Sequence, residues 1–265
     1  MPKATVNTAG QIANAGSGSA GAAPSGANYL VVAFTALGGT GTPTCTYGGV
    51  SVPLDRQEVA AGGNRVAIFK APVSALSGAS GTTLTVTMTA PSFPQLAYWW
   101  LDDVDTASPV VSGESGSGNQ GTQPGAAFIT TVPSGERISL LAGSLDNTAA
   151  PGGTSGNWTS SVTTPSNDMG LSIWDTGSDT TSSPADGADI FGAGTFSQYV
   201  WVYLTLNGTA STGTTNADAS GALGASSTSA YADAEVAGDP TLVNADAAGA
   251  LGTSAATAYA DAEVG

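Results

Sequence analysis

The side chains of this chain that could do chemistry are almost all carboxylates. Twenty Asp and Glu residues stand against five Lys and Arg, histidine is absent, and Cys45 is the single cysteine. This composition provides no Ser-His or Cys-His nucleophile pair, no zinc site of the usual Cys/His type and no disulfide within the chain. Cys45 lies in the segment TPTCTYGG, and we interpret it as a small buried hydrophobic side chain rather than a reactive thiol.

Two groups of carboxylates offer oxygen ligands of the kind that Ca²⁺ takes in sets of about six to eight. One is the DDVD motif, with Asp102, Asp103 and Asp105 at the end of an aromatic segment. The other is an acidic loop that contains Asp175, Asp179, Asp186 and Asp189. Neither has the spacing of an EF-hand loop, and the alternative is that Asp105 caps a turn while the other acids are solvated.

Hydrolysis of glycosides would require two facing carboxylates, one of them with a raised pKa. An acidic β-protein offers many such pairs by chance, and nothing in the sequence selects one of them. A glycan-binding surface would instead use exposed aromatic rings, and the segment Tyr98, Trp99 and Trp100 is the place to expect them. Since consecutive residues of a strand point to opposite faces, we expect one tryptophan in the core and the other exposed or covered by a partner. We predict no catalytic residue, no bound metal and no cofactor.

The chain is strongly acidic, with a formal net charge of -15 at pH 7. Nucleic-acid binding needs a stripe of Lys and Arg that neutralises phosphates, and no segment supplies one, so we expect no nucleic-acid partner. The same charge repels anionic lipid, and no apolar run approaches the roughly 20 residues of a membrane-spanning helix, so we expect no membrane contact.

The N-terminal segment MPKATVNTAGQIANAGSGSAG lacks the continuous apolar core of a secretory signal. A β-rich protein with many hydroxyl groups and no export signal fits a virion protein that is released by lysis. We therefore expect a location on the exterior of a phage-like particle. The alternative is an extracellular or cell-surface location, with a signal already removed.

Short apolar blocks separated by Gly- and Pro-rich turns predict an all-β protein. The first block is YLVVAFTAL, residues 29–37, which has the length of a strand and too many β-branched residues to favour a helix. A long Gly/Ser segment, residues 112–125, separates the two halves of the pattern. Further predicted strands lie at residues 44–54, 65–70, 82–90, 96–104, 127–132, 137–145, 157–162, 169–176 and 198–206.

Two of these segments indicate how their faces are covered. In residues 82–90, Leu84, Val86 and Met88 alternate with threonines, which predicts one buried and one wet face. In residues 198–206 aromatic side chains alternate with aliphatic ones, so we expect both faces to be covered and the strand to be central.

The pattern as a whole predicts a two-sheet β-sandwich, jelly-roll-like, with extended arms at both ends. Two strands around Gly48-Gly49 form a hairpin pattern, which favours antiparallel sheets. We divide the chain into an extended N-terminal arm at residues 1–28, a β-sandwich domain at 29–208 and a C-terminal arm at 209–265.

The order of the segments gives a second indication of the fold. They run YLVVAF, TYGGVSVPL, NRVAIFKAP, TLTVTMTAPS, VDTASPVV, a Gly/Ser-rich gap, NWTSS and a closing YVWVYLTL. In this order, over about residues 28–207, the chain resembles a family of β-sandwich modules found in bacteriophage structural proteins and bacterial surface proteins. The resemblance implies a jelly-roll-type sandwich used for display or attachment, and it implies no catalytic residues. The C-terminal part of the chain is not covered by it.

The C-terminal arm contains a tandem repeat. NADASGALGASSTSAYADAEV, residues 216–236, returns as NADAAGALGTSAATAYADAEV, residues 244–264, with an offset of 28 and sixteen of twenty-one positions identical. The segment is compatible with a short helix or with a strand, and we leave the two open. Too little apolar surface is present for a domain of its own. The apolar anchors of the copies are Leu223, Tyr231 and Val236, and Leu251, Tyr259 and Val264.

These features predict a non-enzymatic virion structural protein. The best match is a capsid decoration, cement or head-fibre protein whose arms dock on neighbouring subunits, with copies of itself and a major capsid protein as partners. The repeats would be two copies of one docking segment, and the two copies would bind two capsid sites, two neighbours or each other. The alternative is a carbohydrate-binding or adhesive module of a tail fibre, a cell surface or a secreted filament, with a glycan as ligand.

Overall fold

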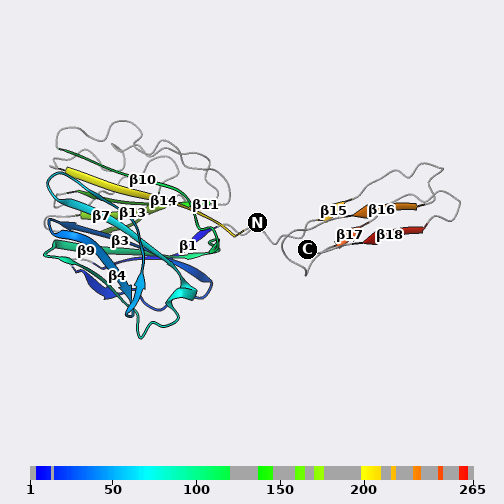
Figure 1. The fold of residues 1–265 in the computed structure, drawn as a ribbon, viewed down its shortest axis with the longest axis horizontal. Helices are drawn as coiled ribbons and strands as arrows, with labels where there is room; N and C mark the ends of the chain where they lie inside the picture. The colour runs from blue at the N-terminus through cyan, green and yellow to red at the C-terminus, as the bar shows by residue number, and fades with distance from the viewer. Residues whose placement is uncertain are drawn as a thin grey trace. The chain divides into compact units, whose positions relative to one another are not determined.

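The computed structural model of the chain describes residues 4–12, 15–119, 137–145, 159–164, 170–175, 198–209, 216–218, 229–233, 244–246 and 257–261. The chain separates into two compact units, one formed by Pro2–Thr209 and the other by Ala210–Gly265 with Met1. We call the first unit the sandwich and the second the tail. Figure 1 shows that strands dominate the described part of both.

Three antiparallel sheets build the sandwich. The central sheet has the order β1 (Thr5–Ile12), β9 (Ser92–Asp102), β3 (Ala27–Leu37), β7 (Asn64–Pro72) and β6 (Leu54–Val59). The five-stranded outer sheet has the order β10 (Val110–Asn119), β14 (Gln198–Asn207), β11 (Arg137–Leu145), β13 (Gly170–Asp175) and β12 (Thr159–Thr164). The four-stranded outer sheet has the order β2 (Ser17–Ser19), β8 (Thr83–Thr89), β4 (Thr40–Tyr47) and β5 (Val50–Val52), and a 3₁₀ turn, η1 (Val73–Leu76), follows β7.

The central sheet is covered on both faces. In β3, Val31 and Ala33 pack in a first core, which the central sheet shares with the five-stranded outer sheet. Leu30, Val32 and Phe34 pack in a second core, shared with the four-stranded outer sheet. Because neighbouring residues of a strand point to opposite faces, a strand between two cores needs an unbroken apolar run. The expected all-β sandwich is therefore confirmed, and the structure adds a third sheet to it.

Local patterns in the sequence account for several strands. The hairpin predicted around Gly48-Gly49 is present between β4 and β5, and both glycines have positive φ values, 53° and 87°. Positive φ at both turn residues matches the right-handed twist of the two strands, and glycine adopts it without a Cβ penalty. In β8 the predicted alternation is confirmed, because Leu84 and Val86 lie in the second core and Met88 packs against it.

The five-stranded outer sheet contains a strand that was not predicted from the sequence. Residues 112–125 read as a Gly/Ser gap, but β10 spans Val110–Asn119 and pairs antiparallel with β14. Gly116 lies opposite Trp201, and a Cβ at Gly116 would lie 2.7 Å from Cζ2 of that indole. The small residues of β10 thus leave room for the aromatic rings of β14. As expected, β14 is a central strand, with β10 on one side and β11 on the other.

The N-terminal segment contributes two edge strands. Residues 1–28 were expected to form an extended arm, but β1 pairs with β9 along the edge of the central sheet and β2 pairs with β8. The amide Nδ2 of Asn7 in β1 donates to Asp102 at the end of β9, at 2.9 Å from Oδ1 and 3.0 Å from Oδ2. Ala4 is fully buried in the first core, and Val6 packs against that core. This segment therefore takes part in the fold from its first described residue.

The tail contains two pairs of parallel strands. β15 (Asn216–Asp218) pairs with β17 (Asn244–Asp246), and β16 (Ser229–Asp233) pairs with β18 (Thr257–Asp261). Figure 1 draws each strand of the first copy beside its counterpart in the second. Of the two conformations that the sequence left open, the described residues of the repeats adopt the strand.

Candidate functional site

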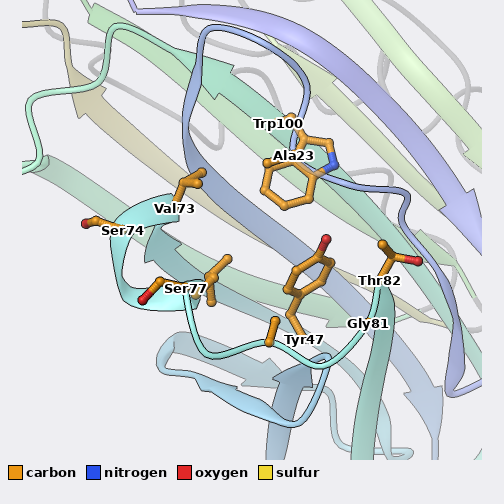
Figure 2. A pocket seen from close by; sticks show the side chains of 10 residues that line it. Ala23, Tyr47, Val73, Ser74, Ser77, Gly81, Thr82 and Trp100 are labelled. Atoms are coloured by element: carbon orange, nitrogen blue, oxygen red, sulfur yellow. The ribbon is translucent and has the colours of Figure 1, made fainter.

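An open pocket lies at the edge of the second core (Figure 2). Its volume is about 540 Å³. Figure 2 shows the rings of Tyr47 and Trp100 facing it, with Val73 and Ser77 on one side and Thr82 on the other. The complete lining consists of Ala23, Tyr47, Val73, Ser74, Leu76, Ser77, Ala79, Gly81, Thr82 and Trp100. The pocket is therefore built by η1, the segment between η1 and β8, the end of β4, Ala23 and one ring from β9.

The polar atoms of the two aromatic residues are already used inside the protein. The hydroxyl of Tyr47 donates to the carbonyl of Gly21 at 2.8 Å, and Nε1 of Trp100 donates to the carbonyl of Ala20 at 3.2 Å. The hydroxyl of Thr82 lies 3.0 Å from that of Ser19. These bonds fix the chain that follows β2 across the pocket wall. The exposed hydroxyls of Ser74 and Ser77 remain available to a ligand, whereas the residues that carry the rings, Tyr47 and Trp100, are 6 % and 1 % exposed.

The pocket offers binding rather than proton transfer. Its ten lining residues include no carboxylate, no cation and no thiol. Burial raises the pKa of Tyr47, so its phenol stays protonated at neutral pH. A mostly apolar wall with a few hydroxyl groups suits a small neutral ligand such as one sugar ring.

The aromatic segment proposed as a glycan contact is largely buried. Trp99 is 0 % exposed in the first core and Trp100 is 1 % exposed in the second. The two indoles point to opposite faces as expected, but neither is exposed, because a sheet of the same chain covers each face. Tyr98 is half-buried, and its ring lies where a side chain at Gly10 of the neighbouring strand would be. Only Trp100 reaches the pocket.

Two carboxylates of the DDVD motif, those of Asp102 and Asp105, have partners within the sandwich, and Asp103 is exposed. Asp102 accepts the two bonds from Asn7. Oδ1 of Asp105 accepts the backbone N–H of Ala107 at 2.9 Å and that of Ser108 at 3.2 Å, which confirms the turn-cap interpretation. Of the acidic loop only Asp175 is described, and the other three acids, Asp179, Asp186 and Asp189, lie outside the described residues. Within the described ranges, no group of three or more His, Cys, Asp or Glu is placed to hold a metal ion.

The cations that the structure describes serve the sandwich internally. Nε of Arg56 and Nζ of Lys70 each lie 3.1 Å from the carboxylate of Asp55. Arg65 is buried and donates to the carbonyl of Gly41 at 2.7 Å, and desolvation lowers its pKa. Arg137 donates through Nε to Oδ1 of Asn207 at 3.1 Å. Each of these four cations thus has a partner within the sandwich.

In the tail, the structure brings the two repeat copies together. Tyr231 lies directly opposite Tyr259 in the register of β16 and β18. The four other predicted anchors, Leu223, Val236, Leu251 and Val264, lie outside the described residues. Asp233 is paired with Asp261 and Asp218 with Asp246, so acidic positions also coincide. The partner of each repeat copy, in the part of the tail that is described, is the other copy.

The chain matches no protein-family model, no curated protein and no solved structure. The described residues contain no helix that is long and apolar enough to cross a membrane. What the structure shows is an all-β protein with antiparallel sheets in the sandwich and a tail whose repeats pair in parallel.

Proposed function

We propose that this protein is a non-enzymatic structural component on the exterior of a phage-like particle. It would be a capsid decoration protein, a cement protein or a head-fibre protein. The sandwich is the displayed part, and the tail docks on neighbouring subunits. The observation that carries this proposal is the in-register pairing of two nearly identical segments, from Asn216↔Asn244 to Asp233↔Asp261. A duplicated strand segment offers backbone N–H and C=O groups that can pair with another strand, and it presents the same binding surface twice. Contacts between subunits of an assembly use such repeated surfaces.

The electrostatics of the sandwich support a structural role. Among the described residues, each group with a resolved pKa shift has burial as the largest cause, and the charges of Asp55 and Glu114 add smaller contributions at Tyr29 and Tyr203; the groups are Tyr29, Cys45, Tyr47, Arg65, Tyr199 and Tyr203. Active sites instead shift the pKa of an acid or base in a cleft through a specific charged partner. The described part of the sandwich has the pattern of a scaffold, in which titratable groups are shifted because they are packed.

Deletion of residues 211–265 tests this proposal. We expect the truncated protein to keep the thermal unfolding of the sandwich, because the sandwich has its own cores, and to lose incorporation into particles. A matched control is the full chain with Ser77→Ala, which alters the pocket and leaves the tail intact, and it should incorporate normally. Normal incorporation of the truncated protein would contradict the proposal.

The pocket favours a second candidate, a carbohydrate-binding or adhesive module. Tyr47 and Trp100, 6 % and 1 % exposed, line the pocket, and Ser74 and Ser77 offer exposed hydroxyls there. On a glycan array, we expect this candidate to give binding that is weakened by Ser74→Ala with Ser77→Ala. Absence of binding to every glycan tested would leave the particle role as the remaining proposal.

A further inference from the structure

We propose that the tail pairs with the tail of a second copy of this chain through the outer edges of its strands, in the same parallel register that joins the two repeats within one molecule. This inference rests on the proposed assembly role of the tail and names the partner of that site. It makes the second copy, rather than a different protein, the first contact of the tail.

The register within one chain repeats at a constant spacing. Asn216 pairs with Asn244, and Ser229 pairs with Thr257, so both strand pairs have the same offset of 28 residues (244 − 216 and 257 − 229). This is also the offset of the sequence repeat. One repeat therefore stacks on the next as a unit, as in proteins built from tandem structural repeats.

Identical repeats make the free edges equivalent to the paired ones. The edge of β16 that receives β18 has the same sequence and register as the outer edge of β18, except that Ser229 is replaced by Thr257. In the described part of the tail each sheet has two strands, so each strand has one edge without a partner strand. Unpaired N–H and C=O groups along such an edge are a template for another strand. The strand that fits the outer edge of β18 best is β16 of a second molecule, because β16 already pairs with β18 within one chain.

The small number of repeats favours extension by a second molecule. One repeat cannot bury its apolar residues alone, and stacks of this kind need about three repeats for stability. Residues 216–264 contain two. Two tails joined in register would give four repeats without any new type of contact. The contact joins the edge of β18 in one molecule to the edge of β16 in the next, so it either closes into a ring or continues as a filament.

Charge sets the conditions for this contact. Residues 216–265 contain seven carboxylates and no Lys or Arg, namely Asp218, Asp233, Glu235, Asp239, Asp246, Asp261 and Glu263. The register places Asp233 opposite Asp261, and like charges at opposite positions weaken strand pairing. Salt screens this repulsion between exposed charges. Association of tails should therefore become stronger as ionic strength rises.

Cysteine pairs between two different chains test the register. One chain carries Ala232→Cys and the other carries Ala260→Cys, and the positions pair directly in the register of β16 and β18. Neighbouring strands lie about 4.8 Å apart, which is within the reach of a disulfide. The matched control replaces the first chain by one with Ala230→Cys, a shift of two residues along the same face. Two residues add about 6.6 Å along the strand, which places the cysteines beyond the reach of a disulfide.

We expect mild oxidation of the first mixture at high salt to give disulfide-linked dimers, at about tenfold higher yield than the control mixture, as a difference of about 1.4 kcal/mol in local pairing would give. The Ala232→Cys chain alone and the Ala260→Cys chain alone should stay unlinked. The native Cys45 is buried, 2 % exposed, so the unmodified chain serves as a blank.

Three results would overturn the inference. They are equal yields in the two mixtures, linkage of the Ala232→Cys chain to itself, or a monomer in sedimentation at every salt and protein concentration. These outcomes are separable from failure of the particle role. If the tail is needed for incorporation while the tails never link to each other, the particle role stands and the partner is a different protein.

Discussion

Tyr47 meets Trp100 edge to face, with ring centroids 5.5 Å apart and an interplanar angle of 83°. Tyr47 belongs to the four-stranded outer sheet and Trp100 to the central sheet, so this contact joins the two sheets across the second core. Each ring also donates one hydrogen bond to the chain after β2, at Gly21 and Ala20. The N-terminal segment is thus held on the sandwich by the same pair of residues that lines the pocket.

The hydroxyl of Tyr47 should contribute measurably to stability. Tyr47→Phe removes the bond to Gly21 and keeps the ring, so we expect the free energy of unfolding to fall by about 1 kcal/mol in chemical denaturation. Ser74→Ala removes an exposed hydroxyl of the same pocket and should change the stability by less than about 0.5 kcal/mol. Equal stability of Tyr47→Phe and the unmodified protein would show that the hydroxyl is better solvated than the structure indicates.

A methyl group at Gly116 should disturb the five-stranded outer sheet. Its Cβ would lie 2.7 Å from Cζ2 of Trp201, and this indole is 6 % exposed and stacks on Tyr203 at a centroid distance of 6.3 Å. Since the ring has little room to move, we expect Gly116→Ala to cost about 1 to 3 kcal/mol. Gly81 has open space at its Cβ position, so Gly81→Ala should leave the thermal midpoint unchanged or slightly higher. A neutral Gly116→Ala would contradict the close packing of β10 and β14.

Replacement of Asn64 should stabilise the sandwich. The residue is 0 % exposed, and neither Nδ2 nor Oδ1 has a hydrogen-bond partner among the residues that the structure describes. A buried polar group without a partner costs about 1 to 3 kcal/mol, and an apolar side chain of similar size avoids that cost. We expect Asn64→Leu to raise the free energy of unfolding by about 1 kcal/mol in urea titrations. Asn64→Asp should lower it, because it buries a charge.

Alkaline pH should destabilise the sandwich through buried groups whose pKa is raised, with those of Cys45 and Tyr29 at about 12. Burial raises the pKa of Cys45 from 9.0 to about 12, and burial with the charge of Asp55 raises that of Tyr29 from 10.0 to about 12. Between these values the unfolded chain releases protons that the folded chain keeps, so the free energy of unfolding falls as pH rises. The contribution is complete below pH 9 and is lost as pH approaches 12.

Urea titrations at several pH values measure this loss. In Cys45→Ala the early part of the decline, from pH 9 to 10, should be shallower than in the unmodified protein, because Cys45 has the lowest ordinary pKa of the raised groups, 9.0, and no longer contributes. The comparison uses the slope with pH, since the substitution also changes packing. Identical slopes in the two proteins would exclude a buried thiol at Cys45.

Strands with a side-chain pattern could be predicted from the sequence. The apolar run of β3, the alternation of Leu84 and Val86 in β8 and the Gly48-Gly49 hairpin each follow from local rules of side-chain direction and turn geometry. The strand β10 could not, because its glycines and serines carry no such pattern. Its place in the sheet depends on the rings of β14, such as Trp201 opposite Gly116, which are distant in sequence.

The number of sheet layers in the sandwich could not be predicted from the sequence either. Trp99 and Trp100 indicate that both faces of β9 carry large apolar side chains, but not whether the cover is another molecule or another sheet of the same chain. The four-stranded outer sheet supplies the cover for Trp100. For the same reason the pocket could not be predicted, since η1, the segment that follows it, β4 and β9 meet only in the folded protein. The repeat was visible in the sequence, whereas its choice of strand pairing was not.

Parallel pairing of the two repeats is the central claim, and a disulfide within one chain tests it most directly. A chain with Ala232→Cys and Ala260→Cys has both cysteines at paired positions, while the control with Ala230→Cys and Ala260→Cys is shifted by two residues. In dilute solution and mild oxidant, we expect the first protein to form an internal disulfide within the monomer and the control to keep its thiols. Equal oxidation of both proteins, or none in either, would contradict the parallel register.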